Sequence, residues 1–563
     1  MKVVIVGGVA GGASAAARLR RLDEEAEIVM LERGAYISYA NCGLPYYIGG
    51  EITEKSALTL QTPERFHQRF GIDVRVNQEV VSVNPTEKTV LVTDGKTGES
   101  SFVSYDKLIL SPGAMPIVPP IEGVEDPRVF TLRNIPDTYC IHEYIQEQKP
   151  KTAVIIGGGY IGVEMAENLV HAGVQVTVVE RSSHLIGPLD REMASDVHSY
   201  LKKKGVGIIL SNGVTKFQAK EEGLHVVLEH GELDCDFVLM SVGVRPDTKF
   251  LQGSGIGLNP RGQIQTNEFM QTNFPDIYAI GDAAEIRHFQ TGEPGFIPLA
   301  GPANKQGRLV ADHICGKARR YAGTQGTSIL KLFDMTVAST GLKEEAAKEA
   351  GLEYDKVYLW TASHATYYPG ATNMQIKVIF ELGTGKILGA QIVGMDGVDK
   401  RIDVLASAIR GGLTGEDLTE LELAYAPPFS FAKDPVNMIG FMIQNLLEEK
   451  VKQYHYHDVP DLQKREDVCL LDVRTETEYQ KGHIEGTLHI PLDDLRQRLG
   501  ELDSSKPVYI NCQSGLRSYL ASRILTQRGF ICSHLAGGYR LYQAVTQDQA
   551  ADFSPTHPCG VPV

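Results

Sequence analysis

The chain has 563 residues, a formal net charge of −15, 42% hydrophobic and 22% charged residues, and 57 glycines. This length is too great for one hydrophobic core, and the composition is that of a globular α/β enzyme with many tight turns, which excludes a disordered or fibrous chain. The acidic charge argues against non-specific nucleic-acid binding, and no stretch approaches the roughly 18 apolar residues of a membrane-spanning helix.

We therefore expect three or four domains, a cytoplasmic location, and neither nucleic acid nor membrane as a partner. Eight cysteines are scattered without a C-x-x-C pair, so we predict no disulfide framework and no metal site. Free cysteine packs as a small hydrophobe, and most of the eight are predicted to be inert core thiols. This expectation covers Cys140, Cys235, Cys315, Cys469 and Cys559.

Residues 3–33 predict a strand, a glycine turn, an alanine-rich helix and a second strand, which together form a βαβ unit. Gly7 would make the tight turn and Gly12 would allow close packing of helix on strand, with the helix N-terminus facing a pyrophosphate. Glu32, about twenty residues further on, suits a ribose hydroxyl. The middle glycine of the usual motif is Val9 here, which weakens this unit when it is taken alone.

The same unit recurs in stronger form at residues 153–180, with Gly157, Gly159 and Gly162 in register and Glu180 ending the next strand. Because the unit occurs twice, a chance match to the motif is not a convincing explanation. An acidic residue accepts both ribose hydroxyls and repels a 2′-phosphate, so Glu180 favours NADH. Arg181 beside it keeps NADPH as an alternative.

Between these units lies a cysteine in an unusual setting, Cys42, with no second cysteine nearby. A flavin enzyme that reduces disulfides with two thiols of its own would place the second a few residues away, where this chain has Ser38. The missing thiol would then come from outside. The alternative is a buried structural cysteine near Pro45.

Residues 277–284 place Asp282 directly after a short apolar strand, where it could bind a polyol; the alternative is a helix N-cap. Strands such as residues 375–380 and a helix from about Asp399 follow. Around residues 448–455 the pattern becomes charged and aperiodic, which indicates a linker. Beyond it, a strand ending at Asn511 delivers Cys512 into a short loop before a helix, so that successive backbone amides could surround an anion.

The two βαβ units, the Gly-Asp strand and Ser-Pro-Gly-Ala-Met-Pro at residues 111–116 resemble the two-dinucleotide flavoprotein reductases over residues 1–445. The match is closest to the coenzyme A-disulfide reductases, on Ser-Tyr-Ala-Asn-Cys-Gly-Leu-Pro-Tyr-Tyr at residues 38–47 and the tyrosine segments at residues 362–370 and 424–429. Residues 456–545 resemble a rhodanese domain, on the segments at residues 468–474, 478–486, 490–491 and 508–518.

The resemblance implies an α/β fold with two Rossmann-like dinucleotide-binding domains, an α+β dimerisation domain and a C-terminal α/β rhodanese domain. The implied ranges are FAD binding at 1–112 and 245–325, NAD(P)H binding at 113–244, dimerisation at 326–447, the linker at 448–455 and rhodanese at 456–563.

The resemblance also implies the residues that hold FAD and NADH. Those for FAD are Gly7, Val9, Ala10, Gly11, Gly12, Glu32, Arg33, Asn41, Cys42, Val80, Pro112, Gly113, Asp282 and Ala300. Those for the nicotinamide cofactor are Gly157, Gly159, Tyr160, Ile161, Gly162, Glu180, Arg181 and Gly243.

Coenzyme A is the implied outside thiol, and its phosphates need local cations in this acidic chain. The implied contacts are Ser14, Arg18, Arg21, Ser38, Asn41, Arg65, Asn304 and Lys433, although a solvated surface role remains open for each arginine. Tyr367 and Tyr425 would arrive from the partner subunit of a homodimer to protonate the leaving thiolate.

In the rhodanese segment, Cys512 would carry a sulfane sulfur with Arg517 closing the loop, whereas Asp472, Arg474 and His483 would brace the fold. A degenerate domain used only for docking is the alternative. Cys532 is predicted to be strand core, with a sulfur-relay role as the alternative.

Joining the halves predicts an enzyme of sulfur metabolism in which NADH, through FAD, reduces coenzyme A persulfide or polysulfide and coenzyme A disulfides. Cys42 would form a mixed disulfide with coenzyme A, and Cys512 would supply sulfane sulfur. Two alternatives stay open. One is a peroxidase or oxidase in which the lone cysteine cycles through sulfenic acid, and the other is a redox-sensing protein that docks a partner.

Overall fold

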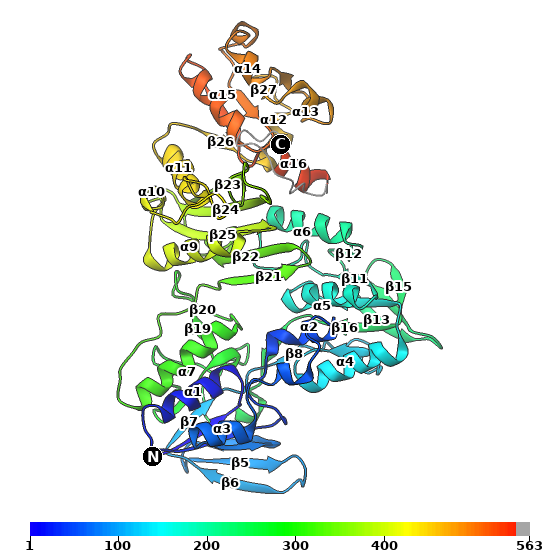
Figure 1. Ribbon diagram of the computed structural model, residues 1–563, viewed down its shortest axis with the longest axis vertical. Helices are drawn as coiled ribbons and strands as arrows, with labels where there is room; N and C mark the ends of the chain where they lie inside the picture. The colour runs from blue at the N-terminus through cyan, green and yellow to red at the C-terminus, as the bar shows by residue number, and fades with distance from the viewer. Residues whose placement is uncertain (548–563) are drawn as a thin grey trace. The chain divides into compact units, whose positions relative to one another are not determined.

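A computed structural model describes residues 1–547, and Cys559 lies outside the described residues. The chain divides into two compact units (Figure 1). One comprises Met1–Arg181 and Asn212–Gly326, and the other Ser182–Ser211 and Thr327–Val563. In the described residues, no helix is both long enough and apolar enough to cross a membrane.

The first unit contains a parallel five-stranded sheet of order β18-β7-β1-β2-β3. Its strands are β1 (Lys2–Val6), β2 (Glu27–Glu32), β3 (Asp73–Val76), β7 (Lys107–Leu110) and β18 (Ile277–Ala279). The central strands are runs of buried Val, Ile and Leu, as expected for a sheet covered on both faces. Helix α1 (Ala10–Arg20) follows β1 and packs against α7 (Ala300–Ile314), so a segment from far along the chain completes this domain.

A second parallel sheet in the same unit has the neighbours β11-β10-β16-β9. Its strands are β9 (Val129–Thr131), β10 (Thr152–Ile156), β11 (Gln175–Val179) and β16 (Phe237–Met240). Helix α5 (Tyr160–His171) follows β10, and α4 (Ile135–Gln148) begins with an Asn134 capping box. These two sheets fall inside the ranges expected for the two nucleotide domains.

Smaller elements complete the first unit. Two antiparallel three-stranded sheets are β4-β5-β6 and β13-β14-β15. Their strands are β4 (Gln78–Asn84), β5 (Thr89–Asp94), β6 (Ser100–Ser104), β13 (Val214–Ala219), β14 (Leu224–Leu228) and β15 (Glu232–Cys235). Two short pairs are formed by β8 (Ala114–Pro116) with β17 (Val244–Pro246) and by β19 (Ile286–Arg287) with β20 (Pro294–Gly295). The short helices are α2 (Leu44–Ile48) and α3 (Pro63–Phe70).

The second unit is built on an antiparallel sheet of order β21-β22-β25-β24-β23. Its strands are β21 (Ser328–Leu332), β22 (Met335–Gly341), β23 (Tyr354–Ala362), β24 (Asn373–Glu381) and β25 (Ile387–Gly394). The helices of this part are α6 (Arg191–Lys203), α8 (Glu344–Glu349), α9 (Val398–Gly411), α10 (Gly415–Glu420) and α11 (Pro435–Leu447). β25 is buried along its whole length, and it packs on both α9 and α6.

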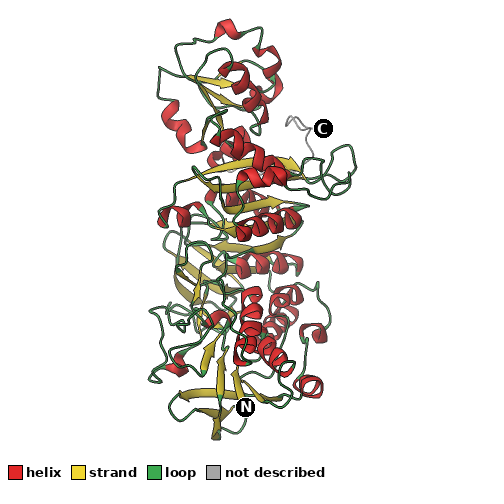
Figure 2. Ribbon diagram, turned by 90° about the vertical axis from the view of Figure 1, so that its left-hand side faces the viewer, coloured by secondary structure: helices red, strands yellow, loops and turns green. Residues whose placement is uncertain are grey.

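The rest of the second unit is a parallel sheet of order β26-β30-β29-β27-β28, with helices packed around its strands (Figure 2). The strands are β26 (Gln453–Tyr454), β27 (Cys469–Asp472), β28 (Leu488–His489), β29 (Val508–Asn511) and β30 (Cys532–Leu535). The helices are α12 (Val459–Leu462), α13 (Glu476–Gln480), α14 (Leu492–Leu495), α15 (Leu516–Thr526) and α16 (Gly538–Gln547).

The predicted linker at residues 448–455 is therefore too long at its C-terminal end. Its residues Gln453 and Tyr454 form β26 and pair with His534 and Leu535 of β30. Tyr454 is 6% exposed and belongs to the hydrophobic core of this domain. A two-residue strand is too short for periodicity to reveal it in the sequence.

Candidate functional site

Cys42 lies in a single 3₁₀ turn, Asn41–Gly43, that leads directly into α2. The turn is held by the Gly43 amide, which donates to the Ala40 carbonyl at 2.9 Å, and Pro45 occupies the first turn of α2, where no amide donor is needed. Cys42 is exposed, which contradicts the alternative of a buried structural cysteine. α2 packs against α5 and α4.

The charges around Cys42 are acidic rather than basic. Although the side chain reaches solvent, desolvation by the surrounding protein raises the pKa of the Cys42 thiol, and the carboxylates of Glu164 and Asp282 raise it further. Glu164 itself accepts a hydrogen bond from the Tyr46 hydroxyl at 3.4 Å, and desolvation raises the pKa of Glu164 to about 7. These residues place carboxylates rather than a cation near Cys42, and a thiolate there needs stabilisation from a bound group.

The first glycine turn has the form that a dinucleotide requires. Gly7 has a φ of +95°, and a Cβ there would collide with the Ser111 carbonyl, while a Cβ at Gly12 would collide with the Gly7 carbonyl. The two carboxylate oxygens of Glu32 accept from the Gly8 and Gly34 amides, both at 2.8 Å. A carboxylate has capacity beyond these two bonds, so Glu32 can still accept from a ribose hydroxyl.

Val9 stands in place of a glycine at a position that does not require a positive φ. It is the N-cap residue of α1 and has a φ of −100°, which ordinary residues adopt. The departure from the usual motif therefore leaves the turn intact.

The second glycine turn repeats this design. Gly157 has a φ of +104° and abuts the Ser241 carbonyl, and Gly162 packs on the Gly157 carbonyl. Glu180 accepts from the Gly158 amide at 2.7 Å, while the space around a Cβ at Gly159 is open. An open, exposed turn at the start of α5 suits a pyrophosphate.

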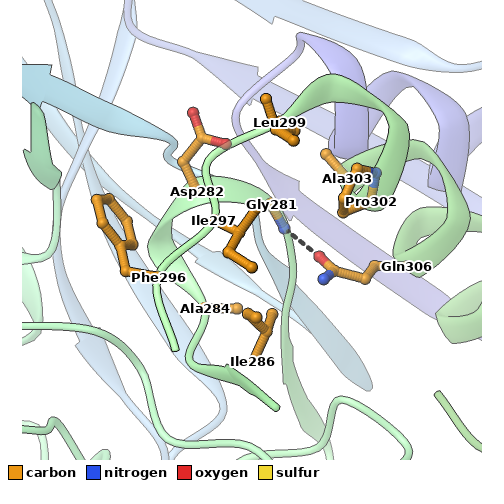
Figure 3. A pocket seen from close by; sticks show the side chains of 10 residues that line it. All are labelled: Gly281, Asp282, Ala284, Ile286, Phe296, Ile297, Leu299, Pro302, Ala303 and Gln306. Atoms are coloured by element: carbon orange, nitrogen blue, oxygen red, sulfur yellow. Dashed lines mark hydrogen bonds between the residues drawn. The ribbon is translucent and has the colours of Figure 1, made fainter. Parts of the chain in front are cut away.

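Asp282 lies in the 3₁₀ turn Gly281–Ala283 at one end of a small pocket (Figure 3). The N-cap residue of this turn is Ile280, so Asp282 is not the cap that the alternative supposed. Burial raises the pKa of its carboxyl, partly countered by Arg133. The Gly281 amide donates to Gln306 Oε1 at 2.7 Å, which ties this turn to α7, and in Figure 3 the Asp282 carboxylate points away from that contact. A desolvated acceptor in this position fits the hydroxyls of a flavin ribityl chain.

The remaining predicted cofactor residues lie on the same two domains. Arg33 is half-exposed and engaged, because it pairs with Asp247 at 2.8 Å and Glu79 at 3.5 Å. Gly113 and Gly243 have φ values of +73° and +112°. The others are Ala10 and Gly11 in α1, exposed Asn41, buried Val80 in β4, Pro112 after β7, Tyr160 and Ile161 opening α5, exposed Arg181, and Ala300 opening α7.

Among the predicted coenzyme A residues, Ser14 and Asn304 are brought together from α1 and α7 by a hydrogen bond between their side chains. Arg18 is bound to the buried carboxylate of Asp312, with Nε at 2.8 Å, so its guanidinium is held rather than freely solvated. Arg21 and Arg65 are exposed on the same unit. Ser38 has a φ of +44°, which is unusual for a residue other than glycine.

The two tyrosine segments meet in the second unit. The hydroxyls of Tyr367 and Tyr425 are 3.1 Å apart, although these side chains are 75% and 46% exposed. Buried Arg401 of α9 joins the segments, because it donates to the Ser430 hydroxyl and the Asp434 carboxylate, and the Ala365 amide donates to the Ser430 carbonyl. Exposed Lys433 lies directly before Asp434.

Cys512 occupies the loop between β29 and α15 and is fully buried. Its Sγ accepts from the Gly515 amide at 3.2 Å and lies 3.4 Å from the Ser518 hydroxyl, to which it donates. Gly538 packs directly against the loop, because a Cβ at this position would lie 2.7 Å from the carbonyl oxygens of Cys512 and Gln513. The loop therefore presents the Gly515 amide to the sulfur.

Arg517, predicted to close the loop, is bound to α13. Its two terminal nitrogens donate to the two carboxylate oxygens of Glu478, each at 2.7 Å. Asp472 and Arg474 form a buried pair at 2.7 Å, and His483 stacks on Tyr479.

The other cysteines differ in how deeply they are buried. Cys140 is exposed on α4, so its prediction as a core thiol is wrong: only one face of this amphipathic helix is buried. Cys235 is buried, and Cys315 and Cys469 are partly buried. Cys532 is 7% exposed and pairs in register with Val508, four positions before Cys512 along β29, or roughly 13 Å at the usual rise per residue. That spacing supports the core interpretation over direct relay.

The residues that sequence reasoning missed are Glu164, Arg401, Glu478 and Gly538. A glycine pair at residues 537–538 was the one visible signal. The three charged residues act through contacts with distant segments, which local motifs do not reveal.

Comparisons with known proteins agree with this geometry. Residues 1–307 match the family model of pyridine nucleotide-disulphide oxidoreductases, residues 327–435 the dimerisation domain of that family, and residues 456–545 the rhodanese-like domain. The coenzyme A disulfide reductase of Staphylococcus haemolyticus (strain JCSC1435) is 38% identical over 79% of this chain and 100% of its own.

Two solved structures extend the similarity over the rhodanese-like part. Reduced CoADR-RHD of Bacillus anthracis is 49% identical with a TM-score of 0.95, covering 97% of this chain and 98% of its own. The NAD-dependent persulfide reductase of A. fulgidus is 37% identical with a TM-score of 0.90, covering 96% of this chain and 100% of its own.

Proposed function

Because the chain belongs to the pyridine nucleotide-disulphide oxidoreductase family, we propose that it is an FAD-dependent enzyme that uses NADH to reduce coenzyme A persulfide, polysulfide and coenzyme A disulfides. The observation that carries the proposal is Cys42, which lies in the 3₁₀ turn before α2 as the single cysteine of its segment. An enzyme with one thiol at this place needs a second from its substrate.

The chemistry assigned to Cys42 is thiol exchange. Its thiolate attacks the inner sulfur of coenzyme A persulfide, a Cys42–S bond to coenzyme A forms, and hydrosulfide leaves. Bound FAD would supply the two electrons of NADH that cleave this mixed disulfide. One proton is then taken up, so that coenzyme A thiol leaves and the Cys42 thiolate returns. A coenzyme A disulfide follows the same route with coenzyme A thiolate as the first leaving group.

Changing Cys42 to Ser tests this step in the full-length holoenzyme. We expect NADH-dependent release of hydrosulfide from coenzyme A persulfide to be lost, because serine cannot form the mixed disulfide. Cys140→Ser, which removes another exposed thiol, should leave turnover unchanged. Full turnover by Cys42→Ser would rule the mechanism out.

NADH is proposed as the electron donor because Glu180 ends β11 beside the second glycine turn. Exposed Arg181 could instead accept the 2′-phosphate of NADPH. Turnover at equal concentrations of the two cofactors decides between them, and a clear preference for NADPH would overturn the assignment.

The proposed assembly is a homodimer in which Tyr367 and Tyr425 serve the Cys42 of the second copy. Support comes from their exposure and mutual hydrogen bond, and from exposed Phe429 in the same segment. In this role a tyrosine hydroxyl protonates the departing thiolate. Coexpression of a Cys42→Ser chain with a Tyr367→Phe/Tyr425→Phe chain should restore activity that neither variant has alone. No recovery in a purified mixed dimer would overturn the shared site.

The binding residues for coenzyme A are proposed at Ser14, Arg18, Arg21, Ser38, Asn41, Arg65, Asn304 and Lys433. Replacing Arg18 and Arg21 with alanine should raise KM for coenzyme A disulfide with a smaller effect on kcat, and an unchanged KM would refute this site. A cytoplasmic location is proposed with it, because NADH and coenzyme A are coenzymes of the cell interior.

Cys512 is proposed to accept sulfane sulfur from the donor and to pass it to coenzyme A. The amide-lined loop supports this role over docking alone. Cys512→Ser should lose uptake of sulfur from a thiol persulfide while it retains reduction of coenzyme A disulfide. If the persulfide loads the variant as well as the parent protein, the assignment fails.

A further inference from the structure

The loop at Cys512 is flanked by arginines, yet each is committed to a carboxylate. Arg517 is 5% exposed and makes the two-point contact with Glu478, which lies across the loop on α13. A bidentate guanidinium–carboxylate pair has a fixed geometry. The charge of Arg517 is thereby balanced by the carboxylate of Glu478.

Arg474 is engaged in the same way. It is 1% exposed, it pairs with the buried carboxylate of Asp472 through Nε and a terminal nitrogen, and its other terminal nitrogen donates to Gln513 Oε1 at 3.2 Å. The contact fixes the Gln513 side chain, which follows Cys512 directly. Arg474 thus orients the loop while Asp472 neutralises its charge.

A third arginine touches the loop through its backbone. The Arg540 amide donates to the Gln513 carbonyl at 3.1 Å, but its guanidinium stacks on Trp360 and lies 3.8 Å from the buried carboxylate of Asp196. The loop residues after Cys512, from Gln513 to Leu516, are uncharged. The groups that contact the sulfur are the Gly515 amide, which donates to Sγ, and the Ser518 hydroxyl.

We propose that this site selects its sulfur donor by charge: it takes sulfur from a thiol persulfide and discriminates against thiosulfate. The inference rests on the proposed function of Cys512 and names its substrate class. Glu478 is the specificity-determining residue, because it withholds the Arg517 cation from the incoming donor.

The charge balance of the two reactions explains the preference. With a persulfide, the Cys512 thiolate attacks the outer sulfur of R–S–SH, a Cys512–S–SH bond forms, and a thiolate R–S⁻ leaves. With thiosulfate, the same thiolate attacks a dianion and expels sulfite, which is also a dianion. Like charges repel strongly in a buried site, and backbone amides alone offer only partial charges against them.

Coenzyme A persulfide fits this site although coenzyme A is itself anionic. Its phosphates lie at the far end of the pantetheine arm, whereas the charges of thiosulfate are bonded to the reacting sulfur atoms. In the second half-reaction the coenzyme A thiolate attacks the outer sulfur of Cys512–S–SH, which yields coenzyme A persulfide and restores the Cys512 thiolate.

The test measures persulfide formation on Cys512 by intact-mass spectrometry of the full-length holoenzyme, with coenzyme A persulfide and thiosulfate as separate donors. In the parent protein, thiosulfate should load Cys512 at least about tenfold more slowly. Glu478→Gln should raise the ratio of thiosulfate loading to persulfide loading by about tenfold, the worth of one charge-assisted hydrogen bond. Gln preserves the capping box with Thr475, so α13 keeps its start.

Glu476→Gln is the matched control, because Glu476 is an exposed carboxylate on the same helix with its own partners, His489 and Gln480. That variant should keep the parent ratio. Reduction of coenzyme A disulfide, assigned to Cys42, reports whether each variant is folded. If Glu478→Gln fails this check, the ratio of the two donors in the parent protein still decides.

The outcomes separate the two proposals. Equal loading from both donors in the parent protein, or an unchanged ratio in folded Glu478→Gln, overturns the charge selection alone. Loading of Cys512 from neither donor overturns the sulfur-carrying function itself.

Discussion

At the scale of single residues, Glu164 sets the chemistry of Cys42 from the neighbouring domain. It reaches the start of α2 from α5, where the Tyr46 hydroxyl donates to it. Its pKa, raised to about 7 by desolvation, means that it gains its charge as pH rises through neutrality. That charge then disfavours a thiolate at Cys42.

Glu164→Gln should therefore lower the pKa of the Cys42 thiol. The expected result is a severalfold faster alkylation of Cys42 by iodoacetamide at slightly alkaline pH, measured in the holoenzyme as a rate against pH. Glu54→Gln, at an exposed position after α2, is the control. A Cys42 profile identical to that of the parent protein would show that Glu164 does not act on it.

The same residue has a consequence for stability. A carboxyl whose folded pKa lies above its unfolded value binds its proton more tightly when folded, so its contribution is present below pH 4.5 and lost as pH rises through about 7. Glu164→Gln should remove this loss.

Much of the site follows from sequence at this scale, and what does not follow has one cause. Gly7 and Gly157 could be identified because they occupy the first glycine position of a dinucleotide-binding motif. Cys42 could be identified because no second cysteine lies near it in the sequence. The partners of Arg18 and Arg517 could not be assigned. Each arginine could face a ligand or a carboxylate, and the choice depends on Asp312 and Glu478, which are distant in sequence.

At the scale of elements, α6 is fixed to the antiparallel sheet by buried charge. Lys377 of β24 is fully buried and pairs with Asp190, Glu192 and Glu344, which come from the start of α6 and from α8. The Tyr358 hydroxyl also donates to Glu192 at 2.7 Å. Three carboxylates thus converge on one ammonium.

Lys377→Met should be strongly destabilising, because it leaves these carboxylates without their shared cation. We expect a loss of about 3–5 kcal/mol in the free energy of unfolding, as when one partner of a buried ion pair is removed. Urea denaturation followed by circular dichroism measures it. Lys386→Met, on an exposed turn, should change stability little.

Acid should weaken the same cluster. Desolvation favours the neutral form of Glu344. The charges and hydrogen bonds of Lys377 and Lys356 outweigh this effect and hold the pKa of Glu344 below the ordinary value of 4.5. A depressed carboxyl pKa stabilises the fold above the unfolded value, and this contribution is lost as pH falls below about 4.5. Glu344→Gln should flatten the fall in thermal midpoint below that pH. A slope equal to that of the parent protein would exclude Glu344 as its source.

At the scale of the second unit as a whole, the rhodanese-like domain is attached at two places to β23. Gln453 donates to Asp355 and to the Lys356 carbonyl, both at 2.8 Å, and His455 lies 3.1 Å from Asp355. Further along β23, Trp360 receives Arg540 of α16. The domains are therefore joined by side chains as well as by the chain itself.

Arg540→Ala should loosen this attachment. It removes the cation from the Trp360 ring and leaves the buried carboxylate of Asp196 without a counter-charge, at a cost of about 2 kcal/mol. Trp360 is the chain's one tryptophan, so its fluorescence reports the contact directly. Emission and unfolding midpoint should both shift, whereas exposed Arg528→Ala should leave both as they are.

The two contacts with β23 restrict the movement of the rhodanese-like domain during the reaction. A carrier domain on a flexible linker could move its bound sulfur between reaction partners. Here the contacts of Asp355 and Trp360 hold the rhodanese-like domain, which contains Cys512, against β23. Under the proposed function, the part that moves during the reaction is then coenzyme A, which has a long pantetheine arm. Turnover should accordingly follow the concentration of free coenzyme A.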